Sequence, residues 1–406
     1  MWQFAAGGAS PLFVTTASPF KFMRRREFIR NAVGSALALA AAHVPGADVS
    51  PGKAAFDGLS PAAGLSGSPS SKLRGVNLGG WLVLERWMVP SVYRDTDALD
   101  EYGLSIALGS RAQKRIVQHR ESFITAGDFR WIKDCGLNAI RLPVGYWALE
   151  APKPFTDAAE CIDFAFDQAS RNGLKVLLDL HGAPGSQNGW DHSGRGGEIG
   201  WHKDPNNIRE TVRVLESFAR KYGKHPALFG IELLNEPRDQ IPIEILKDFY
   251  LESYARIRKH VNPEVAIVFH DSFRAMAWKD FMKAPEYSNV LIDTHLYQSF
   301  SDEDRRRSGR QQVVFALNRG TLLDQMQQEE LPTFVGEWSL ALPPHSLTDL
   351  SAFESHLVNG AYADAQLLSF ERTTGWFFWS YKLESESAWN FRYCVEQGWL
   401  PERFPV

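Results

Sequence analysis

The sequence predicts one (β/α)₈ barrel of the TIM type, a fold of the α/β class, behind an N-terminal leader. Three observations predict this barrel. Eight short apolar runs alternate with longer amphipathic stretches. Most runs are apolar throughout, as strands of a parallel sheet are when both faces are buried. Polar side chains gather where the runs end. A doubly wound open sheet is the alternative, but no G-x-G-x-x-G fingerprint follows the first run and such folds are usually shorter.

The composition excludes several classes of protein. The 406 residues are 44% hydrophobic and carry a formal net charge of −4, which does not suit a basic nucleic-acid binder. Three cysteines cannot form a disulfide framework, and no C-x-x-C pair indicates a zinc site. We therefore expect a monomeric globular protein with no cofactor, no metal and no nucleic-acid partner.

The N-terminal part reads as an export signal. Arg24, Arg25 and Arg26 precede an apolar run at Ala32–Ala42, the order of a secretory signal, and the pair Arg25-Arg26 resembles the twin-arginine motif. The apolar run is too short to span a bilayer, so we expect no stable membrane anchor. The predicted organisation is a leader over 1–46, whose true start is expected at Met23, a flexible linker over 47–72, and a barrel over 73–406. The expected location is the periplasm or the outside of the cell.

The eight runs give the predicted strands, and helical periodicity appears between them. Apolar residues recur at helical spacing from Ile162 to Ala169 and again from Ile208 to Ala219. Eight strand–helix units are expected in all. The predicted strands are Arg74–Gly80, Asn138–Val144, Lys175–Gly182, Leu228–Pro237, Val265–Phe273, Val290–Tyr297, Pro332–Ser339 and Thr374–Lys382.

Polar and aromatic side chains follow each predicted strand where packing alone would not require them. The carboxyl ends of barrel strands meet at one face, where barrel enzymes build their sites. We therefore expect an active site from residues of all eight runs: Asn77, Trp81 and Glu85; Arg141, Tyr146 and Trp147; Asp179 and His181; Asn235 and Glu236; His270 and Asp271; Asp293, His295 and Tyr297; Glu337 and Trp338; Trp376 and Trp379.

Two carboxylates in this set suit glycoside hydrolysis. Glu236 and Glu337 end the fourth and seventh runs, and retaining glycosidases use two carboxyl groups roughly 5–5.5 Å apart. Hydrogen bonds from Arg141 and Tyr297 would keep Glu337 ionised, whereas Glu236 would stay protonated because it lacks such partners. Asn235 would bind a sugar 2-hydroxyl, and Trp379 would offer a flat face to a sugar ring.

The motifs around these residues resemble glycoside hydrolase family 5 and, more narrowly, the exo-β-1,3-glucanases of yeasts. The resemblance runs from about Arg74 to Trp399. Its most specific part is the segment His181–Gly189, whereas Asn235-Glu236-Pro237 is a family-level pattern. The other segments that carry it are Arg74–Glu85, Arg141–Trp147, Ile231–Pro237 and Val335–Ser339.

The resemblance implies roles for individual residues. Glu236 would be the acid/base and Glu337 the nucleophile of a double displacement that releases glucose from a β-glucan. Glu85 would contact the non-reducing sugar, and Trp190 and Phe300 would clamp the substrate at the pocket entrance. Asp191 belongs to the same substrate-binding set, and the residues that would shape the subsite around the cleaved sugar are Arg141, His181, Asn235, His295, Tyr297 and Trp379.

The sequence also departs from the family pattern. His192 replaces an Asn that contacts sugar in the relatives, the run Leu340-Ala-Leu-Pro-Pro replaces an Ala-Leu-Thr-Asp-like run, and Tyr381 stands where relatives usually have Trp. These changes leave other β-linked substrates open: a β-1,6-glucan, a β-mannoside or a glycolipid β-glucoside. A non-catalytic sugar-binding protein is an alternative of another class. A metal-dependent hydrolase is disfavoured, because the first run carries Asn77 and no His-x-His pair.

The 13 Trp residues are many for a chain of this length. Several follow a predicted strand, and we expect them to line a sugar pocket, with Trp131 and Trp278 in the core. The expected pocket residues are Trp81, Trp147, Trp190, Trp338, Trp376 and Trp379.

Overall fold

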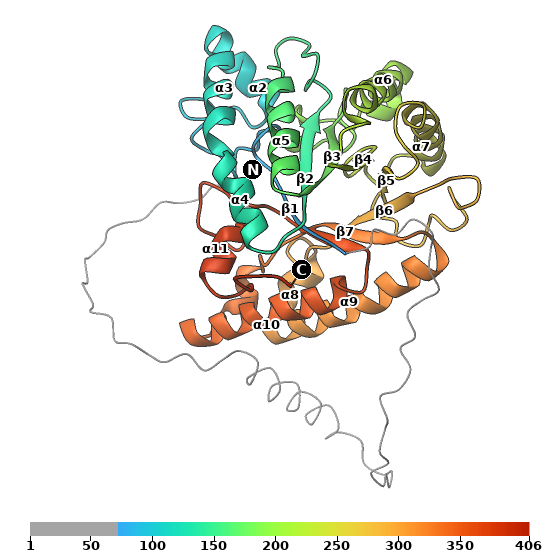
Figure 1. The fold of residues 1–406 in the computed structure, drawn as a ribbon. Coiled ribbons are helices and arrows are strands. Elements are labelled where there is room, and N and C mark those ends of the chain that lie inside the picture. The colour runs from blue at the N-terminus through green and yellow to red at the C-terminus, as the bar shows by residue number, and fades with distance from the viewer. Residues whose placement is uncertain (1–71, 406) are drawn as a thin grey trace. The chain divides into compact units, whose positions relative to one another are not determined.

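The computed structural model describes residues 72–405, and all eight predicted strands are present there. They form one closed parallel barrel in which each strand pairs with the next along the chain and β8 pairs with β1. The predicted (β/α)₈ barrel is thereby confirmed (Figure 1). The predicted leader, and the linker up to residue 71, lie outside the described residues. The strands are β1 (Leu73–Asn77), β2 (Ala139–Gly145), β3 (Lys175–Gly182), β4 (Leu228–Glu232), β5 (Ala266–His270), β6 (Val290–His295), β7 (Thr333–Trp338) and β8 (Gly375–Phe378).

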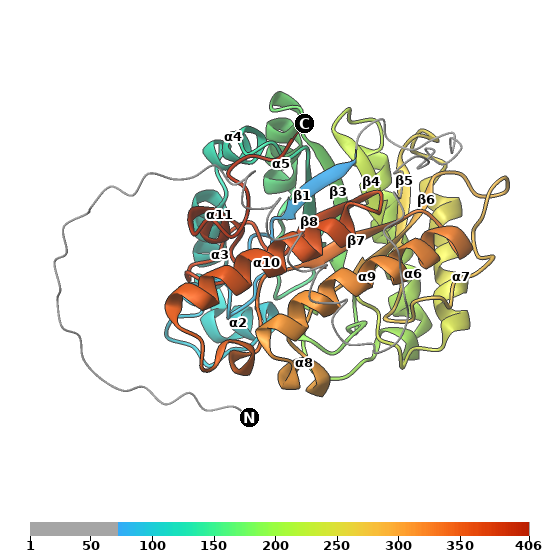
Figure 2. The same ribbon diagram turned by 90° about the horizontal axis from the view of Figure 1, so that it is seen from below.

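Helices occupy most of the connections and surround the barrel (Figures 1 and 2). The two longest described helices, α9 and α10, lie side by side in both views. Within the described part of the chain, no helix is both long and apolar enough to cross a membrane. The helices are α2 (Glu101–Leu108), α3 (Ala112–Phe123), α4 (Ala126–Asp134), α5 (Ala159–Arg171), α6 (Pro205–Tyr222), α7 (Ile243–Ile257), α8 (Asp302–Arg306), α9 (Gly309–Glu329), α10 (Ala352–Phe370) and α11 (Phe391–Glu396).

Helix boundaries follow local chemistry. Asp204 caps α6 by accepting from the Asn206 amide at 2.9 Å, and Pro205 follows at the first helical position, where its missing N–H costs nothing. The buried face of α6 includes Val212 and Leu215, as the helical spacing predicted. The same spacing buries Ile162 and Ala169 in α5.

The expectation of eight strand–helix units is wrong at the fifth unit. No regular helix lies between β5 and β6; turns occupy this connection. Trp278 fills the space instead, because its ring lies 5.0 Å from the Phe269 ring and its indole N–H donates to the Asp271 carbonyl at 2.9 Å. One buried aromatic ring therefore covers the strand where a helix was expected.

The barrel interior has two layers. Side chains two residues apart on a strand point to the same side, so Ala139 and Arg141 both face inward. Near the amino ends of the strands, an apolar layer fills the interior: Leu73, Ala139, Leu177, Ala266, Val268, Leu291, Phe334 and Phe377. Near the carboxyl ends, a charged layer takes over: Arg141, Asp179, Glu232, Asp293 and Glu337. The predicted site lies on this charged layer.

Candidate active site

Arg141 holds the charged layer together from β2, where its side chain has no exposed surface. Its Nε and Nη2 donate to both oxygens of Glu232, at 2.7 and 3.0 Å. Its Nη1 donates to Glu337 at 2.8 Å, and its Nη2 lies 3.1 Å from Asp179. One planar guanidinium therefore fixes side chains from β3, β4 and β7 in a single arrangement.

Glu337 receives both of the hydrogen bonds that the sequence predicted. Arg141 donates to its Oε1, and the Tyr297 hydroxyl donates to its Oε2 at 2.8 Å. The side chain is 5% exposed and lines the cavity. The carboxylate is thus held still by two donors while one edge faces the space that a substrate would enter.

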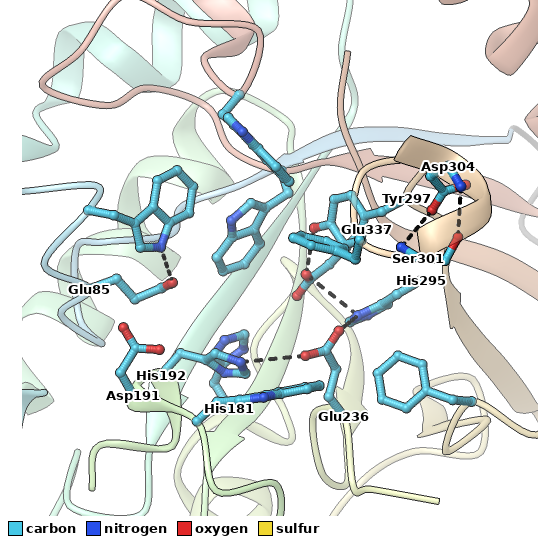
Figure 3. A pocket seen from close by; sticks show the side chains of 16 residues that line it. Glu85, His181, Asp191, His192, Glu236, His295, Tyr297, Ser301, Asp304 and Glu337 are labelled. Carbon is cyan, nitrogen blue, oxygen red and sulfur yellow. Dashed lines mark hydrogen bonds and ion pairs between the residues drawn. The ribbon is translucent and has the colours of Figure 1, made fainter. Parts of the chain in front are cut away.

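Glu236 follows β4 in a left-handed backbone conformation, with φ of 45°, which is uncommon for a residue with a side chain. The prediction that it lacks partners is wrong. His295 Nδ1 lies 2.7 Å from its Oε1, and His192 Nε2 lies 3.5 Å from its Oε2 (Figure 3). The same His295 nitrogen is 3.5 Å from Glu337. One imidazole therefore lies between the two carboxylates.

The protonation order also differs from the prediction. Burial acts to raise the pKa of Glu236, but the hydrogen bond from His295 and the charges of His295 and His192 leave that pKa below its usual value. Burial raises the pKa of Glu337 to about 7, opposed by His295 and reinforced by the negative charge of Glu236. Two carboxylates so close repel each other when both are charged, so the pair tends to keep one proton. The two pKa values therefore describe the pair and not each residue alone. Of the two glutamates, Glu337 has the higher pKa.

His181 and Trp379 form the floor of the pocket. The two rings are stacked, with centroids 5.4 Å apart and planes 6° from parallel. Asp179 lies 2.7 Å from His181 Nδ1 and fixes the ring, while burial lowers the pKa of His181 and keeps it neutral. Asn235 lies beside it, with its Nδ2 3.4 Å from His181 Nε2. Arg141 donates to the Asn235 side-chain oxygen at 2.8 Å, so the amide N–H group of Asn235 is turned toward His181.

Glu85 and Asp191 face each other on the other side of the pocket (Figure 3). The Trp87 indole donates to Glu85 Oε2 at 2.8 Å, whereas Glu85 Oε1 is buried without a partner. Burial and the nearby Asp191 raise the pKa of Glu85 well above its usual value. A buried carboxyl oxygen without a partner is costly, and a sugar hydroxyl would satisfy it.

Aromatic rings surround the pocket entrance. Trp190 and Phe300, the predicted clamp, both line the cavity, and Phe300 is 62% exposed. The ring centroid of Trp389 lies 6.0 Å from that of Phe300 and 5.5 Å from that of Trp87. These three rings therefore form one continuous wall. Phe273, which also lines the cavity, is in edge-to-face contact with Trp190, with ring centroids 6.1 Å apart. The cavity has a volume of about 760 Å³, within the range of small-ligand sites.

The Trp prediction is correct for two residues and wrong for four. Trp190 and Trp379 line the cavity. Four others are fully buried away from the cavity. Trp81, Trp338 and Trp376 belong to the main core, whereas Trp147 packs with Val83 and Phe155 in a small cluster of its own. Trp278 is in the core as expected, and Trp131 is partly buried and packs against the core. The sequence missed Trp87 and Trp389, which lie in loops well beyond β1 and β8.

The residues to which the resemblance assigned roles come together around one cavity or directly beneath it. The cavity is lined by Glu85, His181, Trp190, Asp191, Glu236, His295, Tyr297, Phe300, Glu337 and Trp379. Arg141 and Asn235 lie beneath it with no exposed surface. Other residues that line it were not predicted as site residues: Trp87, His192, Phe273, Ser301, Asp304 and Trp389. The one sequence signal for them was the departure from the family pattern at His192.

No metal site is assigned in the described part of the chain. Two sets of acidic and histidine side chains are close enough to share an ion, and both include His295. In the set of Glu232, Asp293 and His295 the donor atoms are already engaged: Arg141 occupies both oxygens of Glu232, and the Gly336 amide donates to Asp293 at 2.7 Å. In the set of Glu236, His270 and His295, the Nδ1 of His295 already contacts Glu236 at 2.7 Å. The guanidinium of Arg141 also supplies the positive charge that an ion would bring. These groups form a hydrogen-bond network.

Comparison with known proteins identifies the family of this chain. Residues 107–385 match the family model of cellulase (glycosyl hydrolase family 5). The chain belongs to this family. It is 36% identical to a glucan 1,3-beta-glucosidase of Blumeria graminis, covering 82% of this chain and 87% of the relative. It is also 36% identical to a probable glucan 1,3-beta-glucosidase A of Emericella nidulans, covering 82% of this chain and 91% of that relative.

Solved structures that are similar to this chain show the same fold. The crystal structure of AoRut has a TM-score of 0.69 at 22% identity, covering 82% of this chain and 97% of that one. The rutinosidase from Aspergillus niger gives a TM-score of 0.69 at 20% identity, covering 81% and 98%. The chain is accordingly a glycoside hydrolase with a TIM-barrel fold.

Proposed function

We propose that the protein hydrolyses the β-1,3-glucosidic bonds of a glucan from the non-reducing end, releases glucose, and retains the anomeric configuration. The observation that carries this proposal is the pair Glu236 and Glu337, joined by His295 across a pocket floored by Trp379. The names of the relatives support the substrate class.

In the first step, Glu337 attacks the anomeric carbon and the bond to the leaving oxygen breaks, while Glu236 gives its proton to that oxygen. In the second step, water attacks the anomeric carbon, its proton goes to Glu236, and the electron pair of the broken bond returns to Glu337. Glu236 must therefore be protonated first. Binding of a sugar that displaces the His295 hydrogen bond from Glu236 would move the shared proton in that direction.

Two features support exo action. Glu85 and Asp191 offer acceptors to the hydroxyls of a terminal sugar, and the unpartnered Glu85 oxygen lies on the side of the pocket away from His295 (Figure 3). The aromatic entrance suits the sugar rings that follow the cleaved bond, because their C–H faces stack on Trp190 and Phe300.

We also propose that the protein is exported in folded form through a twin-arginine signal, on the evidence of Arg25-Arg26 and the apolar run Ala32–Ala42. Replacement of both arginines by lysine should then leave the full-length protein inside the cell. Unchanged export of that variant would contradict the proposal.

The proposed activity is tested by analysing products from a panel of β-1,3-, β-1,4- and β-1,6-glucans and aryl β-glucosides. The expected result is glucose alone from the β-1,3-glucan, formed first as the β-anomer in proton NMR. Oligosaccharides of mixed length would contradict exo action. An α-anomer formed first would contradict retention. A preference for another linkage would contradict the proposal that the substrate is a β-1,3-glucan.

A further inference from the structure

His192 lines the catalytic pocket beside the predicted acid/base, and none of the roles described so far uses it. Its Nε2 lies 3.5 Å from Glu236 Oε2, the carboxylate oxygen that His295 does not contact (Figure 3). That separation is at the outer limit of a direct hydrogen bond. At this separation one water molecule lying to the side can be within hydrogen-bond distance of both atoms, as bridging waters in active sites are.

The ring is held in place by a rigid turn. The Gly194 amide donates to the Asp191 carbonyl at 2.9 Å, and the Ser193 hydroxyl donates to the Trp190 carbonyl at 2.7 Å. Gly194 has a φ of 87°, and a Cβ there would lie 2.2 Å from the Trp147 ring, so the turn is pressed onto the core. A polar side chain on such a support is preorganised and does not sample the pocket at random.

From this geometry we infer that His192 positions the water that attacks the glycosyl-enzyme in the second step of the proposed mechanism. The inference rests on the proposed function. The water donates one hydrogen to Glu236 Oε2 and the other to His192 Nε2, which leaves its lone pair aimed at the anomeric carbon. As the new C–O bond forms, the bond between that carbon and Glu337 breaks, Glu337 takes the electron pair, and Glu236 takes one proton. His192 keeps only a hydrogen bond.

The surroundings of His192 suit an acceptor of this kind. Burial and the nearby His181 lower the pKa of His192 to about 4, so its ring is neutral at the pH where glycosidases work. The titratable groups that act on His192 are His181 of β3, Asp191 of the same loop as His192, Glu236 after β4 and His295 of β6. A neutral imidazole can accept from water at Nε2, whereas a protonated one cannot.

The test separates the two steps of the reaction. With 2,4-dinitrophenyl β-glucoside the leaving group needs no proton, so the first step is fast and hydrolysis of the glycosyl-enzyme limits kcat. His192→Ala should lower kcat about tenfold, the effect of one hydrogen bond to a positioned group, and leave kcat/KM within about twofold. KM should fall in parallel because the glycosyl-enzyme accumulates. His192→Asn restores the residue of the family pattern and serves as a second variant if the alanine protein folds poorly.

A matched control is available ten residues along the chain. The Nδ1 atoms of His192 and His202 are both buried without a hydrogen-bond partner, but His202 does not line the cavity. His202→Asn should leave kcat and kcat/KM unchanged. A second readout is the share of transglycosylation with a glucoside acceptor, which should rise in His192→Ala because an acceptor sugar is held by the aromatic entrance and needs His192 less than water does.

The outcomes distinguish this inference from the proposed function. Equal losses in kcat and kcat/KM, or no loss in either, in the His192 variants would overturn the role of His192. A wild-type protein without turnover on any β-glucoside would overturn the proposed function instead.

Discussion

The two layers of the barrel interior are built by the same strands but differ in what they do. The apolar layer, with Phe334 and Phe377 in edge-to-face contact at 5.7 Å, needs only to exclude water. The charged layer surrounds one guanidinium, that of Arg141, with four carboxylates. Burying so many charges is costly even when they are paired. The difference indicates that the apolar layer stabilises the barrel, whereas the charged layer is retained for the position and charge of Glu337.

The largest expected effect comes from removing the carboxylate that the charged layer holds. Glu337→Ala should lower turnover by about 10⁴-fold or more, because no glycosyl-enzyme can form. Added azide should restore turnover and give the product of inverted configuration. Near-wild-type activity in this variant, measured with an aryl glucoside, would remove Glu337 from its proposed role.

Arg141→Met should damage both stability and activity. The substitution keeps an unbranched side chain but leaves buried carboxylates unpaired, which costs about 3–5 kcal/mol of unfolding free energy. Denaturant melts and kcat/KM together check this prediction. If stability fell but kcat/KM did not, the charged layer would be only structural.

Phe334→Ala is the counterpart in the apolar layer. Loss of this fully buried ring should cost about 3–5 kcal/mol in unfolding free energy through the lost contacts and the cavity left behind. At a temperature where the variant is folded, kcat/KM should remain within about threefold of the wild type. A loss as large as that of Arg141→Met would show that the two layers cannot be separated.

Phe300→Ala should have a smaller effect, confined to binding. The side chain is 62% exposed, so melting should not change. One aromatic contact accounts for about 0.5–1.5 kcal/mol, so KM for a glucan should rise several-fold with little change in kcat. An unchanged KM would mean that Phe300 does not contact the substrate.

The smallest change is a pH shift that follows from the shared proton. The pKa of Glu337 near 7 means that the pair of glutamates loses its last proton as the pH rises through about 7. The acid is then absent, so kcat/KM on a glucan should fall above that pH. Glu236→Ala on an activated aryl glucoside needs no acid, and its profile should lack this alkaline limb. If the alkaline limb persists in Glu236→Ala, it reports the titration of a group outside the glutamate pair.

The strands could be predicted from the sequence because a buried parallel strand carries its signal locally, in a short apolar run between turns. The ends were less accurate: β4 stops at Glu232, so Asn235 and Glu236 lie in the loop that follows and not in the strand itself. The missing helix after β5 was not foreseen because its role passes to one side chain, Trp278.

The errors within the site have two physical causes. Glu337 faces the barrel interior, so its neighbour Trp338 must face the helices, and position near a strand end does not by itself place a ring in the pocket. The partners of Glu236 come from β6 and from the loop after β3, far apart in the chain. Such contacts depend on how the barrel closes, and no local spacing encodes them.

The most direct test of the proposed mechanism is to identify which residue carries the sugar in the intermediate. The protein is incubated with 2,4-dinitrophenyl 2-deoxy-2-fluoro-β-glucoside, which slows the second step, and the labelled peptide is sequenced by mass spectrometry. The predicted result is one fluoroglucosyl group on Glu337. A label on Glu236, or no label in protein that still hydrolyses β-glucosides, would contradict the account.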